Sequence, residues 1–212
     1  MLTELLPIIG AFILSMTCGA FFIPSVLKFC KKKKLYDIPT LRKVHSAPIP
    51  RLGGIAFIPS MMISAVAVLL IIATNNIQDK ISLSMWSVGF ILSLSIIYSV
   101  GIIDDLIGLN AKVKFVAQIL AASIMPICGL QINDLYGLFG IYEIPSVVGI
   151  PLTILVFVFI DNALNLIDGI DGLATSLSII ALLGFFYCFI PYNLIAYEVM
   201  IAGLVGVLTV YL

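Results

Sequence analysis

The stretch that decides the fold is Pro151-Leu-Thr-Ile-Leu-Val-Phe-Val-Phe-Ile160, with Asn162-Ala-Leu-Asn165-Leu-Ile-Asp168-Gly169-Ile-Asp171-Gly172 close behind it. The first part is apolar enough to be the end of a membrane span, and the second part is polar. Asparagine and aspartate are costly in or near hydrocarbon, so they mark functional sites in membrane proteins. A second acidic pair, Asp104-Asp105, follows another apolar run, Ser93 to Ile103. Two acidic clusters at the ends of apolar segments predict one polar site at the membrane surface.

The composition excludes an ordinary soluble domain. Of the 212 residues, 62% are apolar and 10% are charged, and the mean hydropathy is +1.22. Soluble chains carry roughly 25% charged residues. The short alternating segments of a membrane β-barrel are not seen. The composition therefore predicts an all-α polytopic membrane protein.

Seven apolar runs approach the ~20 residues that a helix needs to cross a bilayer. We expect about seven transmembrane helices, at Leu5–Leu27, Gly54–Ala73, Leu83–Ile103, Phe115–Leu130, Val147–Asn162, Ala174–Ile190 and Ala196–Leu212. The fourth is short, and Pro126 is expected to distort it. Together they form a single transmembrane domain over residues 1–212.

The basic residues predict the orientation. Ten of the eleven fall in Lys28–Arg51 or at Lys112 and Lys114, and only Lys80 lies elsewhere. Because the main cluster lies between spans, the positive-inside rule explains it better than nucleic-acid binding does. The first loop is then cytoplasmic and the N-terminus is outside. Counting spans places both acidic clusters on the cytoplasmic face of a multi-pass protein of the plasma (inner) membrane.

Carboxylates gathered at a membrane surface predict a bound divalent cation, and a cation there suggests phosphate chemistry. The candidate catalytic residues are Asp104, Asp105, Asp168 and Asp171, of which the first three are candidate metal ligands. We expect Mg²⁺, with Mn²⁺ as the alternative. Two interpretations without a functional site stay open: a solvated pair of loop acids, and polar residues that join spans by hydrogen bonds.

Basic and rigid segments accompany the acids. Lys112 and Lys114 follow the first pair, either as substrate contacts or as topogenic charges. The segment His45-Ser-Ala-Pro48-Ile-Pro50-Arg51-Leu-Gly53-Gly54 has prolines that set its direction and a glycine pair that permits close approach of a ligand or helix. It is either part of a binding site or a connector into the next span.

Together these motifs resemble the polyprenyl-phosphate N-acetylhexosamine-1-phosphate transferases, glycosyltransferase family 4. Asp104-Asp105 matches the acidic pair of that family, and Lys112-x-Lys114 with Gln118 looks like its lysine-containing stretch. The run from Asn162 to Gly172 matches its nucleotide-site signature. The segment from His45 to Gly54 looks like the branch that uses UDP-N-acetylglucosamine rather than UDP-muramoyl-pentapeptide.

The resemblance implies a Mg²⁺-dependent transfer of a sugar 1-phosphate from a UDP-sugar to undecaprenyl phosphate, with release of UMP, as the first membrane step of a cell-envelope polysaccharide. The implied partners are the UDP-sugar, the polyprenyl phosphate and membrane lipid, with a homodimer left open and no nucleic acid. It implies a set of substrate-binding candidates: Asn162, Asn165, Gly169, Lys112, Lys114, His45 and Arg51.

Two departures from the family matter. The family has about ten or eleven spans where we expect about seven here, and its further aspartate and histidine-rich loop should lie beyond residue 212. We therefore expect a C-terminally truncated chain, for which an inactive or regulatory fragment that binds nucleotide-sugar or lipid is one alternative function. An ion-coupled transporter is the other, although the sequence shows no internal repeat.

Overall fold

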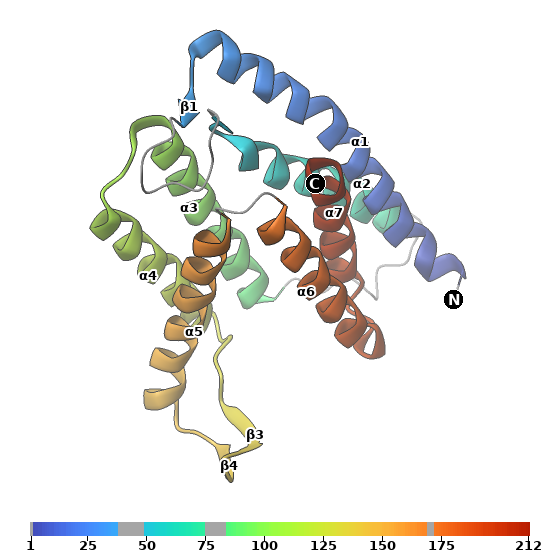
Figure 1. The fold of residues 1–212 in the computed structure, drawn as a ribbon. Helices are drawn as coiled ribbons and strands as arrows, with labels where there is room; N and C mark the ends of the chain where they lie inside the picture. The colour runs from blue at the N-terminus through green and yellow to red at the C-terminus, as the bar shows by residue number, and fades with distance from the viewer. Residues whose placement is uncertain (1, 38–48, 75–83, 169–171) are drawn as a thin grey trace. The chain divides into compact units, whose positions relative to one another are not determined.

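The computed structural model describes residues 2–37, 49–74, 84–168 and 172–212, which form seven α-helices (Figure 1). Their bounds are α1 Leu2–Lys33, α2 Phe57–Thr74, α3 Met85–Ile107, α4 Ala111–Ile127, α5 Ser146–Ile167, α6 Leu173–Phe189 and α7 Ile195–Tyr211. In this part of the chain, five helical segments are long and apolar enough to cross a membrane, whereas α4 and α7 have 17 residues each. The predicted all-α polytopic class is confirmed.

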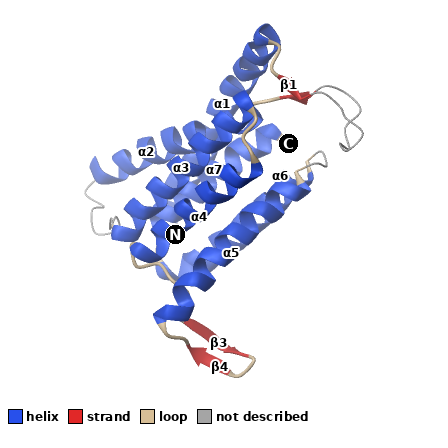
Figure 2. Ribbon diagram, turned by 90° about the vertical axis from the view of Figure 1, so that its left-hand side faces the viewer, coloured by secondary structure: helices blue, strands red, loops and turns tan. Residues whose placement is uncertain are grey.

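Among the described residues, two small hairpins and two 3₁₀ turns connect the helices. Strands β1 (Tyr36–Asp37) and β2 (Ile49–Pro50) pair antiparallel, as do β3 (Asp134–Leu138) and β4 (Ile141–Glu143). Figure 2 shows the second hairpin between the end of α4 and the start of α5. The 3₁₀ turns are η1 (Gly53–Ala56) and η3 (Ile190–Tyr192).

The predicted spans differ from the helices mainly at their ends. Helix α3 continues through Asp104 and Asp105, past the predicted end at Ile103, and α5 continues through Asn165, past the predicted end at Asn162. A helix satisfies its own backbone hydrogen bonds, so it can extend through polar residues at a membrane surface. Pro126 lies in the last turn of α4, which ends one residue later.

The chain divides into two compact units. The first unit comprises Met1–Ser82 and Ile167–Leu212, and the second unit comprises Leu83–Leu166. Each unit therefore carries part of the predicted site: the second unit holds the acidic pair and both asparagines, and the first holds Arg51 and Asp168.

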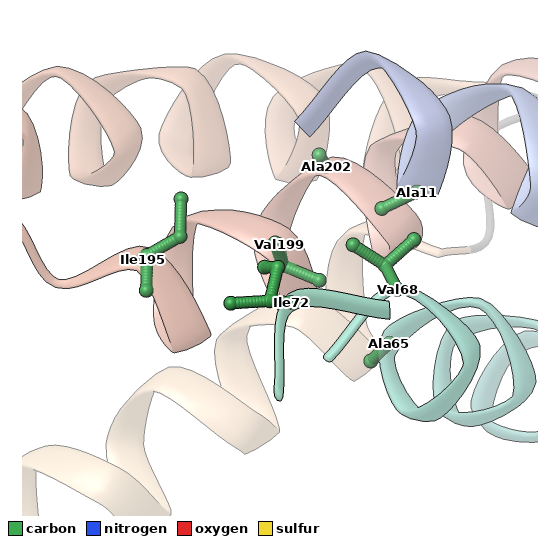
Figure 3. Packing of buried hydrophobic residues seen from close by; sticks show 7 residues of the cluster. All are labelled: Ala11, Ala65, Val68, Ile72, Ile195, Val199 and Ala202. Atoms are coloured by element: carbon green, nitrogen blue, oxygen red, sulfur yellow. The ribbon is translucent and has the colours of Figure 1, made fainter. Parts of the chain in front are cut away.

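In the first unit, α1, α2 and α7 pack closely around small side chains. The core cluster combines alanines with β-branched residues: Ala11, Ala65, Val68, Ile72, Ile195, Val199 and Ala202 (Figure 3). At Gly203 an added Cβ would lie 2.7 Å from Ser64 Oγ, and at Gly206 it would meet the backbone carbonyl of Phe12. Small residues let membrane helices approach closely where the hydrophobic effect cannot hold them together.

In the second unit, α3 and α4 form a tight helical hairpin. Ser93 Oγ donates to the Ala121 carbonyl at 2.8 Å, and Gly89 has room for no side chain against Cys128. Helix α5 connects back to the segment before the β3–β4 hairpin, because Ile132 N–H donates to Thr153 Oγ1 at 2.8 Å. These contacts join α3 to α4, and α5 to the segment that follows α4, and the three helices carry the acidic pair, the lysines and the asparagines.

Candidate functional site

The loop after α3 reverses the direction of the chain, so Asp104 near the end of α3 lies close to the start of α4. Gly108, with φ of 69°, ends α3 in the left-handed conformation that glycine adopts without steric cost. Asn110 then caps α4 by accepting the Lys112 N–H at 3.0 Å. Only three residues connect the two helices, so the first turns of α4 lie beside the last turns of α3.

This reversal pairs two predicted site residues. Lys114 Nζ lies 2.6 Å from Asp104 Oδ2, and both side chains are half-buried. Asp104 Oδ1 accepts the Leu109 N–H at 2.8 Å. Both oxygens of Asp104 therefore have donors from its own unit. Asp105 follows inside α3 and is half-buried, and Lys112 lies exposed in the first turn of α4.

One turn further along α4, an amide pair joins α4 to α5. Asn162 Nδ2 donates to Gln118 Oε1 at 3.0 Å and to the Val158 carbonyl at 2.7 Å. Because residues four apart share a helix face, Lys114 and Gln118 lie on the same side of α4. That side of α4 thus meets the acidic pair through Lys114 and the first asparagine of the signature through Gln118. Asn165 is exposed near the end of α5.

Asp161 is a polar residue of this region that we did not predict. It lies half-buried in α5, and its carboxyl forms a side-chain hydrogen bond with Gln118. The available signal was an acidic residue placed directly after the apolar run Pro151–Ile160. An ionisable residue at that depth deserves a functional hypothesis by default.

The first unit carries the other half of the predicted residues. Asp168 is exposed in the turn that follows α5, and Gly172, with φ of 71°, precedes α6. Arg51 is held by its backbone: its N–H donates to the Leu35 carbonyl at 3.1 Å, and its carbonyl accepts from Cys30 Sγ at 3.0 Å. Its segment is thereby anchored to the end of α1.

Both segments lie at the C-terminal end of α7. An added Cβ at Gly172 would be 3.1 Å from Leu212 Cδ1, and one at Gly53 would be 2.7 Å from the Tyr211 hydroxyl. Tyr211 also stacks edge-on against Phe57, with ring centroids 4.8 Å apart. The Arg51 segment and the end of the signature therefore lie at one end of the first unit.

Three predicted site residues, His45, Gly169 and Asp171, lie outside the described residues. Carboxylate oxygens are the ligands that Mg²⁺ prefers, so Asp104, Asp105 and Asp168 fit that ion chemically. The described ranges contain no group of three His, Cys, Asp or Glu placed to hold a metal. Since Asp104 and Asp105 belong to one unit and Asp168 to the other, a shared ion stays a prediction.

Comparison with known proteins shows which family model and which relatives the chain matches. A sequence model described as glycosyl transferase family 4 matches residues 87–212. The chain is 35% identical over 187 residues to a probable undecaprenyl-phosphate N-acetylglucosaminyl 1-phosphate transferase of Bacillus subtilis, which covers 84% of this chain and 47% of that protein. It is 36% identical over 148 residues to a decaprenyl-phosphate N-acetylglucosaminephosphotransferase of Mycolicibacterium smegmatis, covering 68% and 36%.

A relative whose name gives a different transferred group also matches. The phospho-N-acetylmuramoyl-pentapeptide-transferase of Staphylococcus carnosus is 32% identical over 186 residues, covering 81% of this chain and 55% of that protein. Across these three relatives, the matched part of the chain spans between 36% and 55% of their length.

Proposed function

Because the chain belongs to glycosyl transferase family 4, we propose that it transfers N-acetylglucosamine 1-phosphate from UDP-N-acetylglucosamine to undecaprenyl phosphate and releases UMP. The observation that carries this proposal is the clustering of the acidic pair, Lys114, Gln118 and Asn162 at one end of the second unit. Two relatives with N-acetylglucosamine in their names favour that donor, and the segment from His45 to Gly54 supports the same choice.

The location of the site follows from the two substrates. The acceptor tail lives in hydrocarbon while its phosphate lies at the interface, and the nucleotide sugar is soluble in the cytoplasm. Only a site at the inner membrane face can hold both. We propose that the site residues act at that face, in keeping with the positive charges of Lys31, Lys32 and Lys33 in the last turn of α1.

The reaction needs charge neutralisation more than proton transfer. Both substrates are anionic, so their approach is repulsive, and a phosphate monoester with a second pKa near ~6 is largely dianionic at neutral pH. We therefore propose direct in-line attack of the acceptor phosphate on the β-phosphorus, without an aspartyl intermediate. Positioning and electrostatic stabilisation then supply most of the rate.

The residues take distinct roles in this proposal. Bound Mg²⁺ would neutralise the diphosphate, and Asp104, Asp105 and Asp168 are its proposed ligands. Lys114 is oriented by Asp104 and offsets phosphate charge, and Lys112 and Arg51 add to the same field. Asn162, Asn165, Gly169 and Asp171 bind the nucleotide sugar, and His45 contacts the phosphate region.

Release of UMP tests the proposal. Purified protein is incubated with UDP-N-acetylglucosamine, undecaprenyl phosphate and Mg²⁺, and we expect UMP to appear only when the lipid is present. UDP-muramoyl-pentapeptide serves as the competing donor. Binding of the nucleotide sugar without UMP release would favour a regulatory fragment, whereas ion flux into proteoliposomes without binding would favour a transporter.

A further inference from the structure

The amide of Asn162 has a chemically determined direction. A backbone carbonyl only accepts hydrogen bonds, so the Asn162 atom 2.7 Å from the Val158 oxygen must be the nitrogen. The same nitrogen donates to Gln118 Oε1 at 3.0 Å. An amide nitrogen carries two hydrogens, and these two acceptors use both of them.

The contact with Asp161 agrees with one orientation of the Gln118 side-chain amide. With Oε1 of Gln118 facing Asn162, its Nε2 is left for the Asp161 carboxyl, with which Gln118 forms a hydrogen bond. A hydrogen bond from Gln118 Nε2 to a carboxyl oxygen of Asp161 agrees with the direction that Asn162 already imposes on this amide. Asp161, Gln118 and Asn162 thus form an ordered series, in which the Gln118 amide donates to Asp161 and accepts from Asn162.

This orientation of the Asn162 amide limits which ligand atoms can bind its carbonyl oxygen, Oδ1. Asn162 is exposed, and in the part of the chain that the structure describes no donor contacts this oxygen. A carbonyl oxygen can accept an N–H or O–H hydrogen bond or bind a cation, but it cannot pair with another acceptor. Phosphate oxygens are acceptors and are therefore excluded as its partners.

We propose that Gln118, held by Asp161, is a positioning residue that turns the Asn162 carbonyl oxygen toward a hydrogen-bond donor on the nucleotide sugar. This inference rests on the proposed function for the identity of the ligand. Asp161 and Gln118 act through Asn162, and neither needs to contact the ligand.

An isosteric exchange tests the hydrogen-bond order. In Gln118→Glu two carboxylates face each other, and in Asp161→Asn the constraint on Gln118 is lost. The double variant Gln118→Glu with Asp161→Asn restores the series, because the new asparagine donates to the new glutamate, which still accepts from Asn162. The double variant also keeps the original net charge and side-chain volumes. Gln131→Glu is the matched control, since Gln131 donates to Ser146 at the other end of the unit.

Two readouts are measured on the full chain in detergent: the melting temperature, and the Kd for radiolabelled UDP-N-acetylglucosamine. We expect about tenfold weaker binding for Gln118→Glu and a return to within about twofold in the double variant, since one hydrogen bond near a charge changes affinity by roughly this factor. The melting temperatures should follow the same pattern, and the control should change neither.

Three results would overturn the inference. The first is a double variant that is as impaired as the two single effects multiplied together. The second is recovery of the melting temperature without recovery of Kd, which would leave Gln118 a purely structural residue. The third is loss of binding by the control to the same extent. If the wild-type chain does not bind the nucleotide sugar, the proposed function fails, and the melting temperatures alone decide the hydrogen-bond order.

Discussion

Lys114 Nζ lies 2.6 Å from Asp104 Oδ2 and connects the second turn of α4 to the end of α3. This ion pair orients the Lys114 side chain beside Asp104, and the Leu109 N–H binds the other oxygen of the same carboxylate at 2.8 Å. We therefore propose that Asp104 orients Lys114, while the adjacent Asp105 stays a proposed metal ligand.

The first prediction concerns this pair. Asp104→Asn and Lys114→Met should each lower kcat by about tenfold to a hundredfold, because a misplaced lysine no longer offsets phosphate charge. Stability should change by less than about 1 kcal/mol, since the pair is partly solvated. Transfer kinetics and thermal melting measure the two effects. Lys28→Gln, an exposed lysine outside the site, is the control; equal losses in all three variants would contradict a local role.

The second prediction concerns the metal. Chelation with EDTA should abolish transfer, and added Mg²⁺ should restore it, because the diphosphate needs a neutralising cation. Asp105→Asn should lower kcat by at least about a hundredfold and raise the Mg²⁺ concentration needed for half-maximal activity. Mg²⁺ titration of transfer provides the measurement. Asp134→Asn, in the β3–β4 hairpin, should behave as wild type; normal turnover by Asp105→Asn would remove this residue from the metal site.

The third prediction concerns packing in the first unit. Gly206→Ala should destabilise the chain by about 1–3 kcal/mol, because the new methyl group would meet the Phe12 carbonyl. Gly184→Ala in α6 is the matched control, since nothing lies within 4 Å of its added Cβ. The control should be neutral or stabilising by up to about 1 kcal/mol, as expected for alanine in a helix. Thermal unfolding in detergent compares the two, and equal melting temperatures would argue against the α1–α7 contact.

The fourth prediction concerns topology. Helix α4 separates the Leu109 loop from Phe139 at the tip of the β3–β4 hairpin. In a variant without its native cysteines, Leu109→Cys should react with a membrane-impermeant maleimide only in inverted vesicles. Phe139→Cys, which replaces a side chain that is 90% exposed, should react only in intact cells. Labelling of both positions from the same side would refute the orientation inferred from the basic residues.

The positions of the helices follow from the sequence more directly than the places where they end. The seven helices were predictable because apolar run length reflects the thickness of a bilayer. Their ends were not, because hydropathy falls at Asp104 and Asn162 while the backbone hydrogen bonds continue past both residues. The Lys114–Asp104 pair depends on the Gly108–Asn110 turn, whose geometry hydropathy does not encode. Asp161 was not predicted as a site residue because it directly follows an apolar run and directly precedes the more obvious motif that begins at Asn162.

One measurement tests the central claim most directly: the fate of a doubly labelled UDP-N-acetylglucosamine with ³²P at the β-phosphate and ³H in the sugar. If the chain is a sugar 1-phosphate transferase, both labels should enter the undecaprenyl lipid in equal amounts while unlabelled UMP is released. Transfer of ³H alone, with ³²P left in UDP, would instead indicate an ordinary glycosyl transfer and contradict the account, as would the absence of both labels from the lipid.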